Sequence, residues 1–171
     1  MSYLIQAALL FFSLFALVYA RKALKDYALN PGDFYLLALF SVLGMLVLTS
    51  ANSLLTLYLG LELLSFPLYA LVALQRHSQY SAEAAMKYFI LGALASGLFL
   101  YGLSLLYGAT HSLILSDIQQ IILQGSLVSQ QVLALALIFI AAGFAFKLGA
   151  APFHFWVPDV YQGADSGDPV Y

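Results

Sequence analysis

The sequence contains no cysteine, and this absence excludes thiol redox chemistry, disulfide bonds and cysteine-bound metal clusters. Charge is also scarce: charged residues make up 8% of the chain, against about 25% in soluble domains. A chain with so few charges could not cover a water-facing surface. The net charge of −2 gives no reason to expect a nucleic-acid partner.

The motifs of several enzyme classes are missing as well. The sequence has no phosphate-binding glycine loop, nucleophile elbow or dinucleotide fingerprint. Its three histidines do not cluster with carboxylates at the spacing of metal ligands. We therefore expect no metal site and no bound cofactor on this chain.

Hydrophobic residues, in contrast, make up 63% of the 171 residues, and the mean hydropathy is +0.93, as in an integral membrane protein. We predict an all-α bundle with five transmembrane helices, over about 4–20, 34–50, 54–74, 81–107 and 132–149, and a short interfacial helix over 116–124. The first span has no basic region before it, so we expect a retained helix and not a signal peptide.

Short polar segments separate these spans. Asn30, Pro31 and Gly32 predict a turn, and Ser53 and Ser81 are suitable N-caps for the third and fourth helices. The basic loop residues, Arg21, Lys22, Lys25 and Arg76, all fall on one side of a five-span topology. The positive-inside rule then puts the N-terminus of the chain outside and these residues in the cytoplasm.

Glu62 is the only charged residue between Asn52 and Leu74. In the middle of a helix of this length it lies about 15 Å from either end, near the bilayer midplane. An ionisable group at that depth is costly and usually serves a partner, an ion or a proton. The position favours a functional role, and a structural hydrogen bond to a neighbouring helix is the alternative.

Lys147 lies directly before a predicted helix break. Gly149 to Pro152 interrupt the fifth span, yet the residues that follow remain apolar. We therefore predict a discontinuous last helix whose break lies inside the membrane, where such breaks line ion sites or water-filled paths. Snorkelling of Lys147 to the interface is the alternative.

Lys87 and His154 are weaker candidates. Lys87 lies four residues after Glu83, which allows a surface ion pair, and snorkelling is an equally simple interpretation. His154 follows the break and could relay protons near neutral pH or pack as an ordinary ring.

An acid and an amine buried together in lipid are suited to moving a proton. Burial favours the neutral form of each group and pairing favours the charged form, so the two forms lie close in energy. A proton or a nearby charge can then change the pairing.

Three stretches carry a family resemblance: LYLGLELLSFPLYALVA, SAEAAMKYFILGALASGLFLYGLSLLYGAT and GFAFKLGAAPFHFWVPDVYQGA. They resemble subunit N of the bacterial proton-translocating NADH–quinone oxidoreductases (respiratory complex I). That family belongs with the antiporter-like subunits related to Mrp-type cation/proton antiporters. The resemblance covers roughly residues 35–164, and the third stretch is the most specific.

The resemblance implies proton translocation coupled to electron transfer from NADH to quinone, with this chain as a non-redox subunit of the translocase. Glu62 matches the family's intramembrane glutamate, Lys147 matches the lysine of its discontinuous helix, and the family pairs these two. Lys87 matches a further lysine. By the same resemblance, NADH, FMN, iron–sulfur clusters and quinone belong to other subunits. The expected partners are other membrane-arm subunits and the lipid bilayer of the bacterial cytoplasmic (inner) membrane.

The chain departs from the family in two ways. It matches helices three to seven, so residues 1–164 are expected to form a partial antiporter-like transmembrane domain. Residues 165–171 differ from the family's continuation and are interpreted as a divergent tail. We therefore expect a fragment that is inactive when isolated. The alternatives are a subunit of a Mrp-type cation/proton antiporter and a nonfunctional truncated product of either protein.

Overall fold

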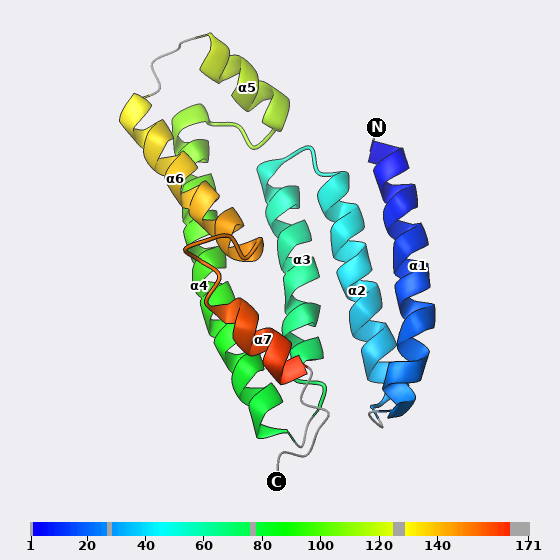
Figure 1. Ribbon diagram of the computed structural model, residues 1–171. Helices are drawn as coiled ribbons and strands as arrows, with labels where there is room; N and C mark the ends of the chain where they lie inside the picture. Colours follow the sequence, from blue (N-terminus) through cyan, green and yellow to red (C-terminus); the bar gives the residue numbers. More distant parts are fainter. Residues whose placement is uncertain (1, 27–28, 76–77, 125–128, 165–171) are drawn as a thin grey trace.

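The structure, a computed structural model, describes residues 2–26, 29–75, 78–124 and 129–164 (Figure 1). These residues form helices α1 (Ser2–Asp26), α2 (Pro31–Thr49), α3 (Leu54–Val72), α4 (Gln79–Thr110), α5 (Leu115–Leu123), α6 (Gln130–Lys147) and α7 (Trp156–Ala164). Arg76 and the predicted tail at 165–171 lie outside the described residues.

Five of the described helices are long and apolar enough to cross a bilayer: α1, α2, α3, α4 and α6. The predicted all-α fold with five spans is therefore confirmed. The short helix expected in the long polar segment is α5, and the interrupted fifth span is α6 followed by α7.

The helix starts confirm some of the predictions and contradict others. The side chain of Ser53 caps α3 by accepting a hydrogen bond from the backbone N–H of Thr56, as predicted. The turn predicted at Asn30 to Gly32 was wrong. The Asn30 side chain accepts from the N–H of Gly32 and Pro31 is the first residue of α2, because proline's missing N–H costs nothing there.

The cap of α4 was also predicted wrongly. Ser78 caps this helix by accepting from the N–H of Ser81. Ser81 itself is fully buried, and its hydroxyl donates to the carbonyl of Gly163 at 2.6 Å. The start of α4 is thereby attached to the end of α7, 82 residues further along the chain.

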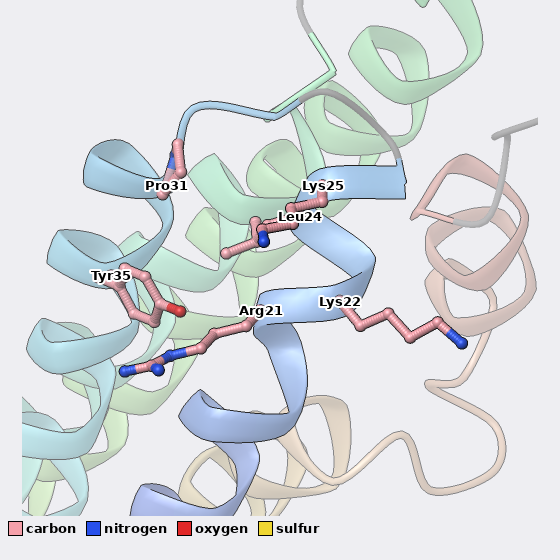
Figure 2. Close-up of a pocket in the computed structure, with 6 residues that line it drawn as sticks. All are labelled: Arg21, Lys22, Leu24, Lys25, Pro31 and Tyr35. Carbon is pink, nitrogen blue, oxygen red and sulfur yellow. The ribbon is translucent and has the colours of Figure 1, made fainter.

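The basic end of α1 remains helical beyond the predicted span. Arg21, Lys22 and Lys25 end the apolar run but not the helix, since both residue types favour helices. A cavity of about 530 Å³ lies between this end of α1 and the start of α2 (Figure 2). Its lining consists of Arg21, Lys22, Leu24, Lys25, Pro31 and Tyr35.

Helix α4 is the centre of the packing. It contacts α3 on one side and both α6 and α7 on another, whereas α2 packs on α3 and α1 packs mainly on α2 (Figure 1). Phe99 of α4, 1% exposed, is at the centre of the main apolar cluster, with Leu61 of α3 and Ala136 of α6 among its members. The two halves of the interrupted span therefore share one supporting helix.

Small residues bring α2 and α3 close together. A Cβ on Gly44 of α2 would lie 2.8 Å from the carbonyl carbon of Leu63, and one on Gly60 of α3 would lie 2.9 Å from the backbone nitrogen of Leu48. Close approach at small residues is a common way to pack helices in membranes, where apolar burial contributes little. This contact fixes the helix that carries Glu62.

An isolated antiparallel bridge joins Ser53 to Ile114. Leu54 N–H donates to the carbonyl of Leu113 at 2.8 Å, and Leu115 N–H donates to that of Asn52 at 3.1 Å. The turn between α2 and α3 is thus tied to the segment between α4 and α5.

Candidate functional site

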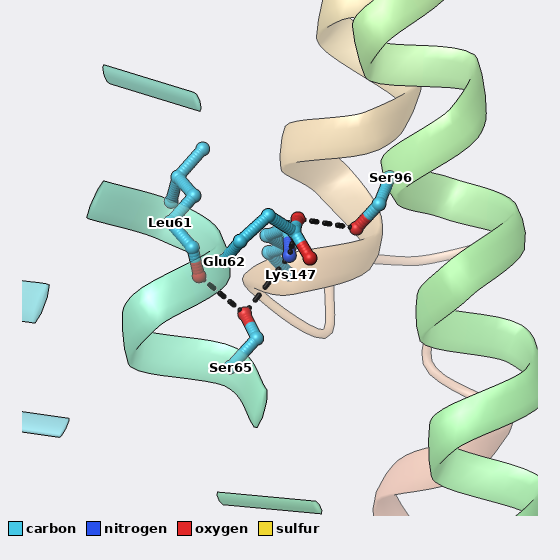
Figure 3. Close-up of polar contacts among 5 residues, drawn as sticks. All are labelled: Leu61, Glu62, Ser65, Ser96 and Lys147. Carbon is cyan, nitrogen blue, oxygen red and sulfur yellow. Dashed lines mark hydrogen bonds and ion pairs between the residues drawn. The ribbon is translucent and has the colours of Figure 1, made fainter. Parts of the chain in front are cut away.

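Glu62 lies in the middle of α3, on the side that faces α4 and α6 (Figure 3). The residue is 8% exposed, which is unusual for a glutamate unless it has partners. The carboxylate has two: one oxygen, Oε1, accepts from the hydroxyl of Ser96 at 2.6 Å and from Nζ of Lys147 at 3.2 Å. Three helices, α3, α4 and α6, thus contribute side chains to one buried cluster that contains an ion pair.

Lys147 makes a second contact in the same place. Its Nζ donates to the hydroxyl of Ser65 at 2.9 Å, and that hydroxyl donates to the carbonyl of Leu61 at 2.7 Å (Figure 3). The side chains of Lys147 and Glu62 are 11% and 10% exposed, respectively. In each of these hydrogen bonds the ammonium group or a serine hydroxyl is the donor, and an oxygen atom is the acceptor.

Burying two charges together costs several kcal/mol each after relaxation, about as much as their attraction returns. The serine hydroxyls reduce that cost, because a hydrogen bond to a charged group contributes about 1.5–3 kcal/mol. Within the described residues no buried side-chain nitrogen or oxygen lacks a hydrogen-bond partner. The polar atoms of the pair therefore have hydrogen-bond partners. A proton added to Glu62 or removed from Lys147 would change these contacts.

The end of α6 explains where Lys147 lies. Gly149 has a φ of +62°, its N–H donates to the carbonyl of Phe146, and the N–H of Ala150 donates to that of Ala145. This is a Schellman C-cap, for which glycine is the preferred residue. Lys147 is therefore the last residue of α6, where the helix dipole favours a cation.

Helix α7 follows the break in the interrupted span and contacts the end of α6. The indole N–H of Trp156 donates to the carbonyl of Phe146 at 3.1 Å, and the Trp156 ring stacks on Tyr88 of α4 with centroids 4.4 Å apart. The chain is non-helical from 148 to 155, a longer break than the predicted Gly149 to Pro152. The carbonyl of Phe146, which also accepts from the N–H of Gly149, thus connects the end of α6 to a side chain of α7.

Lys87 lies outside the Glu62–Lys147 cluster. It is exposed on α4, and its Nζ lies 2.9 Å from a carboxylate oxygen of Glu83 and 3.1 Å from one of Asp159. The ion pair with Glu83 is the one that the spacing allowed. The second pair joins α4 to α7 and was not expected.

His154 is likewise separate from the cluster. Its side chain is exposed and stacks on the neighbouring ring of Phe155, with centroids 5.5 Å apart. Its carbonyl accepts from the N–H of Val157 in the turn that starts α7. No group of three or more possible metal ligands among His, Cys, Asp and Glu occurs in the part of the chain that the structure describes.

Comparison with known proteins identifies the family. The sequence signature of "NADH:quinone oxidoreductase/Mrp antiporter, TM" matches residues 51–166. The chain belongs to this family. The match includes Glu62, Lys87, Lys147 and His154, so every candidate residue lies within the family's transmembrane region.

Curated relatives within the family are similar over most of the chain. NADH-quinone oxidoreductase subunit N of Paraburkholderia phymatum is 58% identical over 87% of this chain and 30% of its own length. Its counterpart in Halorhodospira halophila is 58% identical over 94% of this chain and 33% of its own length. The chain thus spans about a third of the length of these relatives.

Two solved structures of membrane complexes also match. Respiratory complex I from Thermus thermophilus with bound Aureothin contains a chain with 48% identity and a TM-score of 0.65, over 76% of this chain and 28% of that one. The membrane-bound sulfane sulfur reductase, an archaeal respiratory membrane complex, gives 31% identity and a TM-score of 0.69, over 75% and 26%. Chains of two different membrane complexes therefore have a fold similar to that of this chain.

Sequence reasoning missed three polar partners of the candidate residues: Ser65, Ser96 and Asp159. Ser65 follows Glu62 by three residues, so helical periodicity could have indicated that it lies on the same face. Ser96 and Asp159 lie on other elements, and only the packing of α4 and α7 shows their contacts.

Proposed function

We propose that this chain is part of an antiporter-like membrane-arm subunit of a bacterial NADH–quinone oxidoreductase and takes part in proton translocation. The observation that carries the proposal is the buried Glu62–Lys147 pair at the break between α6 and α7. Its support comes from relatives named NADH-quinone oxidoreductase subunit N, at 51–58% identity.

In the proposed mechanism both groups are charged while they are paired. A proton that reaches Oε1 of Glu62 removes the negative charge, and the attraction that holds Nζ of Lys147 is lost. The ammonium group then gives up its proton to water in the non-helical segment at 148–155. Transfer of the proton from Glu62 to the neutral amine of Lys147 recharges both groups and restores the pair, so one cycle carries one proton from Glu62 past the break.

The two serines have distinct tasks in this cycle. Ser96 donates to the carboxylate and stabilises its charged form, whereas Ser65 accepts from the ammonium group. Ser65 can accept because it donates its own proton to the carbonyl of Leu61. Each charge therefore keeps one neutral hydroxyl partner when the other charge changes.

The redox chemistry belongs to other subunits in this proposal. The chain acts as a non-redox subunit, binds none of NADH, FMN, iron–sulfur clusters or quinone, and responds to their reaction through neighbouring membrane-arm subunits. We place it in the bacterial inner membrane as a multi-pass protein with its N-terminus outside, because Arg21, Lys22 and Lys25 gather at the other end of α1.

The test is Glu62→Gln in the full-length subunit within the assembled complex. Because this change removes the charge but keeps the size, we expect NADH-driven acidification of inverted membrane vesicles to fall by about tenfold or more, equivalent to about 1.4 kcal/mol in the barrier. Quinone reduction coupled to it should fall as well.

The matched control is Glu83→Gln, the same chemical change on an exposed glutamate of α4. The amount of assembled complex is measured for both variants, so that a loss of assembly is not mistaken for a loss of transport. Normal acidification by assembled Glu62→Gln complex would refute the proposed role.

A further inference from the structure

Helix α7 has only nine residues, too few for a stable isolated helix. Its position therefore depends on its contacts with α4. Three polar or aromatic contacts join the two: Ser81 to the carbonyl of Gly163, Tyr88 to Trp156, and Lys87 to Asp159. They are spread along α7 from its first turn to its end.

We propose that Asp159 and Lys87 form an interhelical ion pair whose task is to position α7, and through α7 the end of α6 that carries Lys147. Lys87 is then a positioning residue and does not carry the translocated proton. This inference rests on the proposed function, because it assigns Lys87 and Asp159 a part in holding the same site.

The geometry distinguishes the two carboxylates that contact Lys87. Glu83 lies on α4 itself, one turn before Lys87, so its ion pair cannot restrain another element. Asp159 lies on α7, and its carboxylate oxygen is 3.1 Å from Nζ of Lys87. Only the second pair can restrain α7.

A chain of contacts leads from Asp159 to Lys147. Trp156, three residues before Asp159, donates its indole N–H to the carbonyl of Phe146, and the rings of Trp156 and Phe146 have centroids 5.6 Å apart. Phe146 directly precedes Lys147 at the end of α6. A shift of α7 therefore removes a hydrogen bond from the last turn that holds Lys147.

The first test measures the position of α7 directly. Val160 of α7 is partly buried and packs against a cluster of Val72 of α3 with Ala84 and Ala85 of α4. In a cysteine-free full-length subunit within the complex, the thiol of Val160→Cys is reacted with a maleimide. We expect Asp159→Asn to raise the labelling rate about two- to fivefold, the size expected for a partly exposed ion pair. Glu83→Gln is the matched control and should leave the rate unchanged.

The second test asks whether the charges act as a pair. In the Glu83→Gln background, Lys87→Glu or Asp159→Lys alone should raise labelling and lower NADH-driven proton translocation. The two combined should restore both values to within about twofold of the background, because the ion pair is reversed but remade. A proton carrier at position 87 that acted alone would not depend on the charge at position 159, so rescue by the second change indicates a pair.

The outcomes separate this inference from the proposed function. Unchanged labelling in Asp159→Asn refutes the positioning role and leaves the Glu62 test unaffected. Faster labelling with unchanged translocation also overturns the inference, because α7 would then move without consequence for Lys147. Failure of the reversed pair to restore translocation, with labelling restored, would show that Lys87 acts by another route.

Discussion

At the scale of single residues, the site depends on hydroxyl groups as much as on charges. Ser96 contributes a 2.6 Å hydrogen bond to the same oxygen of Glu62 that accepts from Lys147. Two donors on one oxygen concentrate the stabilisation of the charged carboxylate there. Removing the neutral donor should leave the Glu62 carboxylate with one contact fewer without removing either ionisable group.

We therefore predict that Ser96→Ala weakens coupling less than Glu62→Gln does. A hydrogen bond to a charged group is worth about 1.5–3 kcal/mol, and a water that enters the space would recover part of it. NADH-driven acidification of vesicles should fall by about threefold to tenfold. Ser104→Ala, which removes an exposed hydroxyl of the same helix, is the control and should have no effect. Equal loss in both variants would contradict the role of Ser96.

The sequence predicted the charged residues of the site but not its hydroxyls. Glu62 and Lys147 were noticeable because charges are rare in apolar spans, and the family resemblance paired them. Serine is common in membrane helices and leaves no such signal. The contact of Ser96 with Glu62 depends on how α3 and α4 are rotated, which no local pattern determines.

At the scale of elements, the interruption between α6 and α7 is caused by a glycine cap. From the sequence we predicted a break at Gly149 to Pro152 and attributed it to all four of these residues. In the structure Gly149 alone has the left-handed conformation that ends α6, and the helix does not resume until Trp156. The start of α2, predicted as a turn, and the cap of α4 were misjudged because several turn-forming or polar residues in a row are each chemically suitable.

Gly149→Ala should destabilise the end of α6. An alanine at a φ of +62° costs about 1–2 kcal/mol, and its Cβ would lie 3.0 Å from a methyl carbon of Val157. We expect a lower melting temperature of the purified complex, or less assembled subunit, and slower translocation.

The control is Gly97→Ala, the same substitution in the helical interior of α4. A Cβ there would meet nothing within 4 Å, and alanine favours helices by about 1 kcal/mol over glycine. It should leave the stability unchanged or raise it. A Gly149→Ala variant as stable as Gly97→Ala would argue against the cap as the cause of the break.

At the scale of the whole molecule, hydropathy fixed the number of spans but not their packing. The five long helices were predictable because each needs enough apolar residues to cross a bilayer. That α4 supports α3, α6 and α7 together follows from side-chain shape, which composition does not reveal. Much apolar surface remains exposed, including Phe11, Phe12 and Phe15 of α1, each more than half exposed.

The topology gives a prediction for the whole chain. With the N-terminus outside, Gln119 of α5 lies on the outer side and Gln79, the first residue of α4, on the cytoplasmic side. Gln119→Cys should react with a membrane-impermeant maleimide in intact cells. Gln79→Cys should react only after the cells are permeabilised. The reverse labelling pattern would show that the chain has the opposite orientation in the membrane.

The bridge between Ser53 and Ile114 limits how the helices can rearrange. Its two backbone hydrogen bonds tie the start of α3 to the segment that follows α4, so these helices cannot slide along each other without breaking both bonds. Glu62 and Ser96 lie further along these two helices, so the bridge helps to set the register at which their side chains meet. Near the opposite ends, Tyr69 of α3 packs against Tyr88 and Phe89 of α4. The two helices are thus held at both ends, and a change in the pairing of Glu62 is expected to leave their register intact.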